Sequence, residues 1–335
     1  MSTFARVDAS VLSDWGAVLA AYGDDIDCDA PSLAVDDVAQ TVDLSQFVAF
    51  LEKAGKSPGG PGRSWAAGIG AHYESRGCIG RAILGAPNLG VAFLRLSQNF
   101  ALVQDVTSLR LDADERMATL SYRILDPDIW PRHEDAMYSL GAYAAFIRAA
   151  APDVWSEAEI TVEAEADYVN AELSSIVQAP VSYGGSSNML RFPVRALDCG
   201  FPISKPVKSA DLTALSGQLA ARRRALPITA RTRQIIYSEI LEGAVCQDRV
   251  AREMGLSPRS LRRKLAEQGF SYQGLVDDCR MRLAALEFRA RKDLSLSELA
   301  LKLGYSEHST FSRAFARWAG VPPQRYRRGM HEHMN

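Results

Sequence analysis

The chain has 335 residues, a hydrophobic content of 47% and a formal net charge of −2, so it exceeds one ordinary core and does not have the composition of a disordered protein. Its apolar runs are shorter than the ~20 residues that a membrane span needs, and we therefore expect a cytoplasmic protein with no membrane partner. The cysteines show no CxxC spacing, which argues against a disulfide framework or a zinc site and favours buried small side chains: Cys28, Cys78, Cys199, Cys246 and Cys279.

The chain begins with predicted helices. Helical material is expected over residues 7–22, and a second helix that ends near Gly55 carries an apolar stripe of Leu44, Phe47, Val48 and Leu51. The SPGGPG segment at residues 57–62 has the composition of a loop. A turn at Pro87 then precedes a helix whose apolar face holds Leu89, Phe93 and Leu96.

Strand patterns follow. Residues 108–125 alternate like a hairpin that turns around Asp112–Glu115, and a long helix is predicted over His133–Ala150. Another strand is expected over Ala158–Ala164, and Pro180–Leu197 contains two short strands around a Gly184-Gly185 turn. This interleaving predicts a mixed α/β domain in the first part of the chain.

Residues 205–227 contain a short helix with Leu212, Leu215 and Leu219 on one side and three arginines, Arg222–Arg224, at its end. Two interpretations stay open. The helix is either an ordinary element packed on one domain or a linker that relays the state of one domain to the other. The arginines either contact phosphate or are simply solvated.

Residues 297–327 have the pattern of a helix, a tight turn, a second helix and a stop. Leu299, Ala300 and Leu303 recur at helical spacing before Gly304, where glycine is the residue that ends a helix in the left-handed conformation at least cost. Ser306 is expected to cap the second helix. In that helix Phe311, Phe315 and Trp318 form one buried stripe, which leaves Ser309, Thr310 and Arg313 on the other faces.

The same pattern occurs upstream, where Leu299, Ala300, Gly304, Ser306, Phe311 and Phe315 have as counterparts Val250, Ala251, Gly255, Ser257, Leu261 and Leu265. The outward positions of the upstream second helix are arginines, namely Arg259, Arg262 and Arg263. Two short helices joined by a tight turn present the second helix to a groove of DNA. We therefore predict two DNA-contacting helices, although any single arginine is also consistent with a solvated helix face.

Charge is distributed unevenly along the chain. Residues 228–335 hold 19 Lys and Arg against 12 Asp and Glu, or +7, so the remaining residues hold 19 against 28, or −9. A basic segment binds polyanions through counterion release, whereas an acidic one is repelled by phosphates. The C-terminal segment is thus the expected partner of nucleic acid.

The repeated pattern resembles the AraC/XylS family of bacterial transcription regulators. GYSEHSTFSRAFARWAGVPPQRYR is similar to the signature of the second unit and VAREMGLSPRSLRRKLAEQGFSY to the first, and the resemblance covers about residues 228–328. It implies an all-α domain in which a long central helix, Ser271–Arg291, holds two helix-turn-helix units against double-stranded DNA. It also implies an activator that contacts RNA polymerase, and a repressor of the same architecture is the alternative.

Residues 8–204 resemble the arabinose-binding-type sensor domain of the subgroup that includes ornithine and virulence regulators. The residues that carry this resemblance are Gly80, Leu89, Gly90, Tyr168, Pro180–Tyr183, Asn188, Leu190, Phe192 and Leu197. The resemblance implies a small-molecule effector, of unknown identity, and association into a homodimer.

Catalytic signatures are missing from the sequence. There is no GxSxG, no phosphate-binding GxxxxGK[ST] and no HExxH pattern, so we expect no enzyme, no cofactor and no metal site. A purely structural DNA-bending role would not need the large first domain. The sequence therefore predicts an α+β protein with an effector-sensing and dimerisation domain at 1–204, a linker at 205–227 and a DNA-binding domain at 228–335.

Overall fold

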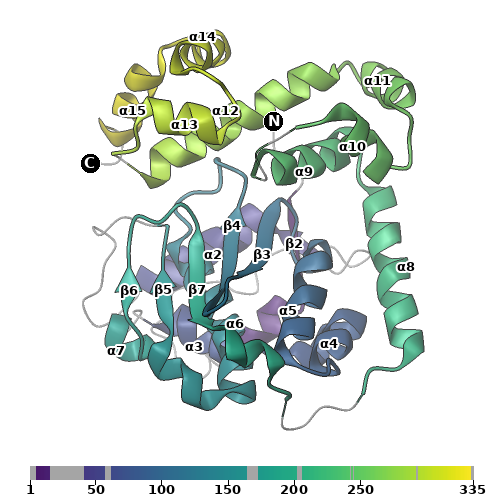
Figure 1. Ribbon diagram of the computed structural model, residues 1–335, viewed down its shortest axis with the longest axis vertical. Coiled ribbons are helices and arrows are strands. Elements are labelled where there is room, and N and C mark those ends of the chain that lie inside the picture. Colours follow the sequence, from purple (N-terminus) through teal and green to yellow (C-terminus); the bar gives the residue numbers. More distant parts are fainter. Residues whose placement is uncertain are drawn as a thin grey trace. The chain divides into compact units, whose positions relative to one another are not determined.

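The computed structural model describes residues 5–15, 41–56, 62–163, 173–201, 206–241, 243, 245–291 and 293–332. The chain forms two compact units (Figure 1), one comprising Met1–Ile124 with Ile129–Ala221 and the other Leu125–Asp128 with Arg222–Asn335. The first unit mixes strands and helices, and the second is helical. This organisation confirms the predicted α+β class. Over the described residues, no helix is both long enough and apolar enough to cross a bilayer.

A five-stranded mixed sheet, ordered β3-β4-β7-β5-β6, forms the centre of the first unit (Figure 1). The strands are β3 (Thr107–Ala113), β4 (Met117–Ile124), β5 (Glu159–Thr161), β6 (Val181–Ser182) and β7 (Asn188–Pro193). The predicted hairpin is β3 and β4, with Leu111 opposite Leu120. The strands predicted around Gly184-Gly185 are β6 and β7, but β5 lies between them and pairs in parallel with β6. A separate two-stranded sheet pairs β1 (Arg6–Asp8) with β2 (Thr41–Asp43).

The described helices of the first unit agree largely with the prediction. They are α2 (Leu44–Lys56), α3 (Arg63–Ile69), α4 (Gly77–Leu84), α5 (Leu89–Gln98), α6 (His133–Ala150) and α7 (Leu173–Val177). The predicted helices at α2, α5 and α6 are confirmed. Within the expected helix at 7–22, residues 7 and 8 belong instead to β1 and residues 11–15 are helical, while 16–22 lie outside the described residues, as do 57–61 of the expected loop.

Helix α6 lies in the middle of this unit and contacts α3, β4 and β7. Its backbone approaches α3 closely, because a Cβ added to Gly68 would lie 2.1 Å from the Tyr138 carbonyl oxygen and one added to Gly141 would lie 2.6 Å from that of Trp65. Further along α6, Phe146 packs edge-on against Tyr73 and Phe93, at 4.5 and 6.2 Å between ring centroids. Tyr143 of α6 also contacts Tyr122 of β4, at 6.2 Å between ring centroids, so α6 and the sheet share one aromatic core.

The start of α6 carries a buried carboxyl group, Glu134, which accepts a hydrogen bond from Ser64 Oγ at 2.5 Å. The Glu134 backbone N–H donates to Glu52 Oε1 at 2.7 Å, so the two acids lie close together. Burial raises the pKa of Glu134 to about 7, with the Ser64 hydrogen bond opposing and the Glu52 charge adding to the rise. Its neighbour Asp135 is also buried, which raises its pKa to about 7.

These carboxyl groups predict a pH-dependent stability. The folded state binds a proton more tightly than the unfolded state when an acid has a higher pKa in the folded state. The contribution of such an acid to the free energy of unfolding is therefore present at low pH and is lost as pH rises through the folded-state pKa of about 7. We expect the free energy of unfolding to fall between pH 5 and pH 8, with at most about 3 kcal/mol from Glu134. Burial lowers the pKa of His133 to about 4 in the folded state. At pH values below its ordinary pKa, His133 therefore makes the free energy of unfolding rise with pH, which opposes the effect of the acids.

Comparison of variants separates these contributions. Glu134→Gln should remove the Glu134 share of the pH dependence in urea titrations at pH 5 and pH 8, whereas Glu74→Gln, at an exposed position, should keep the wild-type dependence. If the free energy of unfolding changed with pH equally in the wild type and in Glu134→Gln, the Glu134 carboxyl group would not be the source of the pH dependence.

Helix α8 (Ser209–Ala225) forms within the predicted linker. Of the three leucines expected on one side, Leu215 is 4% exposed, while Leu212 and Leu219 are only half-buried. The helix is therefore more exposed than its sequence pattern predicts.

The described cysteines differ in their surroundings. Cys78 and Cys279 are buried as expected, Cys199 is half-buried and Cys246 is exposed. The prediction of a buried residue is wrong for Cys246, because it precedes a short surface helix as its N-cap. Cys28 lies outside the described residues, and among those described no three His, Cys, Asp or Glu side chains gather as metal ligands would.

Candidate nucleic-acid interface

The second unit contains two helix-turn-helix modules. The first is α10 (Gln247–Glu253) with α11 (Pro258–Ala266), and the second is α13 (Leu296–Lys302) with α14 (His308–Ala319). They are joined by α12 (Tyr272–Ala290), which matches the predicted central helix, and are flanked by α9 (Ile228–Leu241) and α15 (Pro323–Glu332).

The first helix of each module ends in the same way, at a glycine in the left-handed conformation. Gly255 and Gly304 have φ angles of 67° and 79°, in the left-handed region predicted for both glycines. The residue after each glycine donates its N–H back into the preceding helix, Leu256 to the Ala251 carbonyl and Tyr305 to the Ala300 carbonyl, both at 2.9 Å. The repeated sequence pattern therefore corresponds to a repeated structure.

The second helix starts one residue later in the second module. Ser257 caps α11 by accepting from the Ser260 N–H at 3.1 Å, as expected. The prediction that Ser306 caps α14 is wrong, because the N-cap is Glu307, with no side-chain cap hydrogen bond. The turn of the second module is one residue longer, so Ser257 corresponds in structure to Glu307.

The apolar anchors of the modules are mostly buried, as the sequence predicts. Leu261, Leu265, Phe311 and Phe315 are all 0% exposed. The prediction of a buried Trp318 is wrong: its side chain is 40% exposed, because it lies at the end of α14, where its ring contacts Phe315 and Tyr326 on one side only.

Buried glutamates hold the first helix of each module to the preceding long helix. In the first module Glu239 on α9 accepts from the Cys246 N–H at 2.7 Å and pairs with Arg249 Nε at 2.6 Å. In the second, Glu287 on α12 pairs with Lys302 Nζ at 2.7 Å. Since a buried charge is tolerated only when it is paired, these contacts define where α10 and α13 sit.

The residues predicted to contact DNA are all exposed on the second helix of their module. Arg259, Arg262 and Arg263 lie on α11, and Ser309, Thr310 and Arg313 lie on α14. Arg263 has only a weak contact with Glu267 at 3.7 Å, with both side chains largely exposed. The structure thus gathers three predicted residues on each helix.

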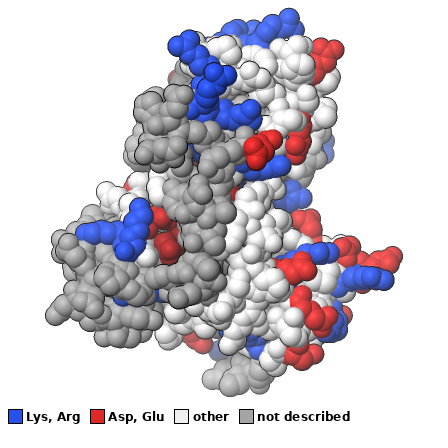
Figure 2. Space-filling view, turned by 90° about the vertical axis from the view of Figure 1, so that its left-hand side faces the viewer, with Lys and Arg blue, Asp and Glu red and all other residues white. Residues whose placement is uncertain are grey.

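Other basic side chains add to this surface. Lys264 on α11 is exposed and Arg317 on α14 lies near the end of its helix; neither was predicted, although their positive charge was a visible signal in the sequence. Figure 2 shows Lys and Arg side chains at the top of the view, with some Asp and Glu side chains beside them, and further Lys and Arg side chains lower down. Such a surface attracts phosphates, and arginine can bind guanine with two hydrogen bonds in the major groove.

The comparisons with known proteins cover both units. Residues 26–201 match the arabinose-binding domain of AraC transcription regulator, N-term, and residues 250–329 match a helix-turn-helix domain. An uncharacterized HTH-type transcriptional regulator of Mycobacterium tuberculosis is 33% identical over 180 residues, which are 51% of this chain and 49% of that protein. The ornithine utilization regulator of Pseudomonas aeruginosa is 46% identical over 80 residues, or 24% of this chain and 23% of that protein.

Among solved structures, the transcriptional regulator CdpR from Pseudomonas aeruginosa is 20% identical and aligns over 84% of this chain and 90% of its own, with a TM-score of 0.38. The chain spans about half the length, or less, of the two curated relatives. The N-terminal family match alone covers more than half of the chain, and the helix-turn-helix match covers much of the second unit. The chain belongs to the AraC family of transcription regulators.

Proposed function

We propose that this protein is a sequence-specific transcription regulator that binds double-stranded DNA through α11 and α14. The supporting observation is that two modules, whose first helices both end at a left-handed glycine, carry Arg263 and Arg313 at equivalent positions, each six residues after the N-cap of its second helix. Around them, Arg259, Arg262, Ser309 and Thr310 complete the proposed base-contacting set.

The first unit carries the regulatory role in this proposal. Residues 1–204 sense a small-molecule effector and form a homodimer, residues 205–227 are a linker, and residues 228–335 bind DNA. The match of residues 26–201 to an arabinose-binding-type domain supports the effector, without identifying its chemistry. We propose an activator that contacts RNA polymerase in the cytoplasm and has no catalytic activity, and a repressor of the same architecture is the alternative.

Selection of binding sites from random DNA tests the proposal. The wild-type chain should select a defined motif, and Arg263→Ala and Arg313→Ala should each relax the preference at a different position. Loss of an arginine that binds guanine with two hydrogen bonds costs about 1 to 3 kcal/mol of discrimination.

A matched control is Arg110→Ala, which removes a partly exposed arginine from β3 in the first unit. It should keep both the motif and the affinity. If both module variants retained the wild-type motif and affinity, α11 and α14 would not be the helices that contact bases. If the wild-type protein selected no motif, the proposed function itself would be wrong.

A further inference from the structure

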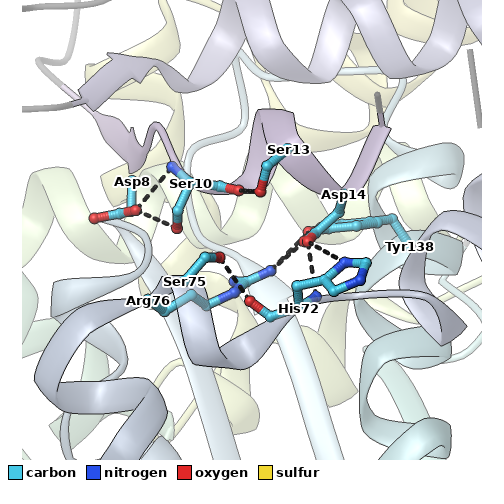
Figure 3. Close-up of polar contacts among 8 residues, drawn as sticks. All are labelled: Asp8, Ser10, Ser13, Asp14, His72, Ser75, Arg76 and Tyr138. Carbon is cyan, nitrogen blue, oxygen red and sulfur yellow. Dashed lines mark hydrogen bonds and ion pairs between the residues drawn. The ribbon is translucent and has the colours of Figure 1, made fainter. Parts of the chain in front are cut away.

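Helix α4 lies next to a buried polar cluster formed by Asp14, Arg76 and Tyr138 (Figure 3). Arg76 immediately precedes α4, and its side chain is 4% exposed. Its Nη2 donates to Asp14 Oδ2 at 2.5 Å and to Tyr138 Oη at 2.9 Å, and Tyr138 Oη donates to the same Asp14 oxygen at 2.5 Å. The other Asp14 oxygen accepts from the His72 N–H at 2.9 Å. The cluster therefore connects residues 11–15, α6 and the start of α4.

The backbone of α4 is held tightly to the turn before it. A Cβ added to Gly80 would lie 1.7 Å from the Tyr73 carbonyl oxygen, so α4 touches the short 3-10 helix η3 (Tyr73–Ser75) directly. The Arg76 guanidinium stacks on the Tyr73 ring at 4.4 Å, and that ring packs against Phe146 of α6. Interiors packed this closely transmit displacement, so a change in the position of Arg76 has to move α4.

The outer side of α4 contacts α8. Arg81 Nε pairs with Asp211 Oδ1 at 2.8 Å, and the Cys78 thiol donates to Gln218 Oε1 at 2.9 Å. Leu215 is the one described residue of α8 that is buried, and it belongs to the core of the first unit. Leu212, which is half-buried, also packs against that core. A helix held by one buried leucine, one half-buried leucine and partly exposed polar contacts has a low free energy of local opening.

The boundary between the two compact units, after Ala221, falls inside α8. The last turn of this helix carries Arg222, Arg223 and Arg224, and the helix-turn-helix modules follow in the chain. Helix α8 is therefore continuous in the chain with the helix-turn-helix modules, so a change in how α8 is held acts on the segment that leads to them.

We propose that α4 couples the Asp14–Arg76–Tyr138 cluster to α8, so that a rearrangement of the cluster changes how firmly α8 is held on the first unit. The coupling starts at the cluster, because a single buried carboxylate there joins three separate segments of the chain. Helix α8 is the element that responds, because all of its residues except Leu215 are exposed or half-buried. The consequence for DNA binding rests on the proposed function, whereas the coupling itself does not.

Trypsin cleavage after the exposed Arg223 and Arg224 in the full chain measures how often α8 opens. Arg81→Asp and Asp211→Arg should each accelerate this cleavage about two- to fivefold, as expected for loss of a partly exposed ion pair. The double variant Arg81→Asp/Asp211→Arg restores an ion pair and should return the rate toward that of wild type. These variants test the contact between α4 and α8.

Tyr138→Phe tests the coupling, because this substitution removes a hydroxyl from the cluster without touching α8. We expect faster cleavage at Arg223 and Arg224, together with faster amide hydrogen exchange in α8. Asp14→Asn provides a second cluster variant if Tyr138→Phe does not fold. Reversal of the exposed pair Arg191 and Glu159, which are 3.4 Å apart on the sheet, is the matched control and should leave cleavage unchanged.

The coupling would be overturned if both cluster variants folded but left α8 cleavage and exchange at wild-type rates. It would equally be overturned if cleavage rose at all trypsin sites of the first unit together, since that pattern indicates general unfolding. DNA affinity is a separate measurement: if cleavage follows the expected pattern but the wild type binds no DNA, the proposed function fails and the coupling stands.

Discussion

Phe315→Ala is expected to unfold the second helix-turn-helix module and to abolish DNA binding. Phe315 is fully buried, and its ring packs at 5.1 to 5.7 Å against Tyr326, Phe288, Phe311 and Trp318. Truncating a core phenylalanine to alanine costs about 3 to 5 kcal/mol. That is a large part of the about 5 to 15 kcal/mol by which whole domains are stable. Circular dichroism and protease sensitivity of residues 294–332 would report the loss.

The matched control for this variant is Leu301→Ala. Leu301 lies on α13 of the same module but is 67% exposed, so its truncation should change stability by less than about 0.5 kcal/mol. A Phe315→Ala protein that remained folded and protease-resistant while losing DNA binding would place Phe315 at the DNA surface, contrary to the structure.

Glu163→Gln is expected to destabilise the first unit strongly. Glu163 lies between two buried arginines, with Arg123 Nη2 at 2.6 Å from its Oε1 and Arg132 Nη2 at 2.6 Å from its Oε2. All three side chains are at most 4% exposed. Removing one partner of a buried ion pair costs about 3 to 5 kcal/mol, because the remaining charge is left uncompensated.

Urea unfolding of the full chain, followed by tryptophan fluorescence, measures this effect. Trp130 is a suitable reporter, because the Arg132 guanidinium lies over its ring at 5.4 Å. Glu159→Gln removes an exposed carboxylate from β5, four residues before Glu163, and should cost less than about 1 kcal/mol. If Glu163→Gln lowered the free energy of unfolding by an equally small amount, burial of the two arginines would not depend on the charge of Glu163.

Elements with strong local signals could be predicted from the sequence. Helix α6 and the hairpin of β3 and β4 have clear periodicity, and Gly255 and Gly304 end helices as only glycine does at low cost. The central helix α12, in contrast, was expected from the family resemblance. The outward position of Arg263 followed from helical spacing alone. These features depend on residues close to one another in the chain.

Other features could not be predicted from these local patterns. The N-cap of α14 is Glu307 because the turn before this helix is one residue longer than in the first module. Ser306 was predicted instead because serine is a better N-cap residue than glutamate. Trp318 is aromatic and correctly spaced, yet it lies where the helix leaves the core. Strand β5 inserts between β6 and β7 because sheet order is set by pairing across long separations.

The sequence by itself determined the class of this protein, because the turn glycines, the apolar anchors and the charge asymmetry are local or compositional properties. Only the tertiary structure revealed the buried ionic groups. Asp14 and Arg76, Glu163 and Arg123, and Glu287 and Lys302 are separated by 15 to 62 residues in the chain. A charged residue has the same appearance in sequence whether it is solvated or buried, and folding alone brings its partner within reach.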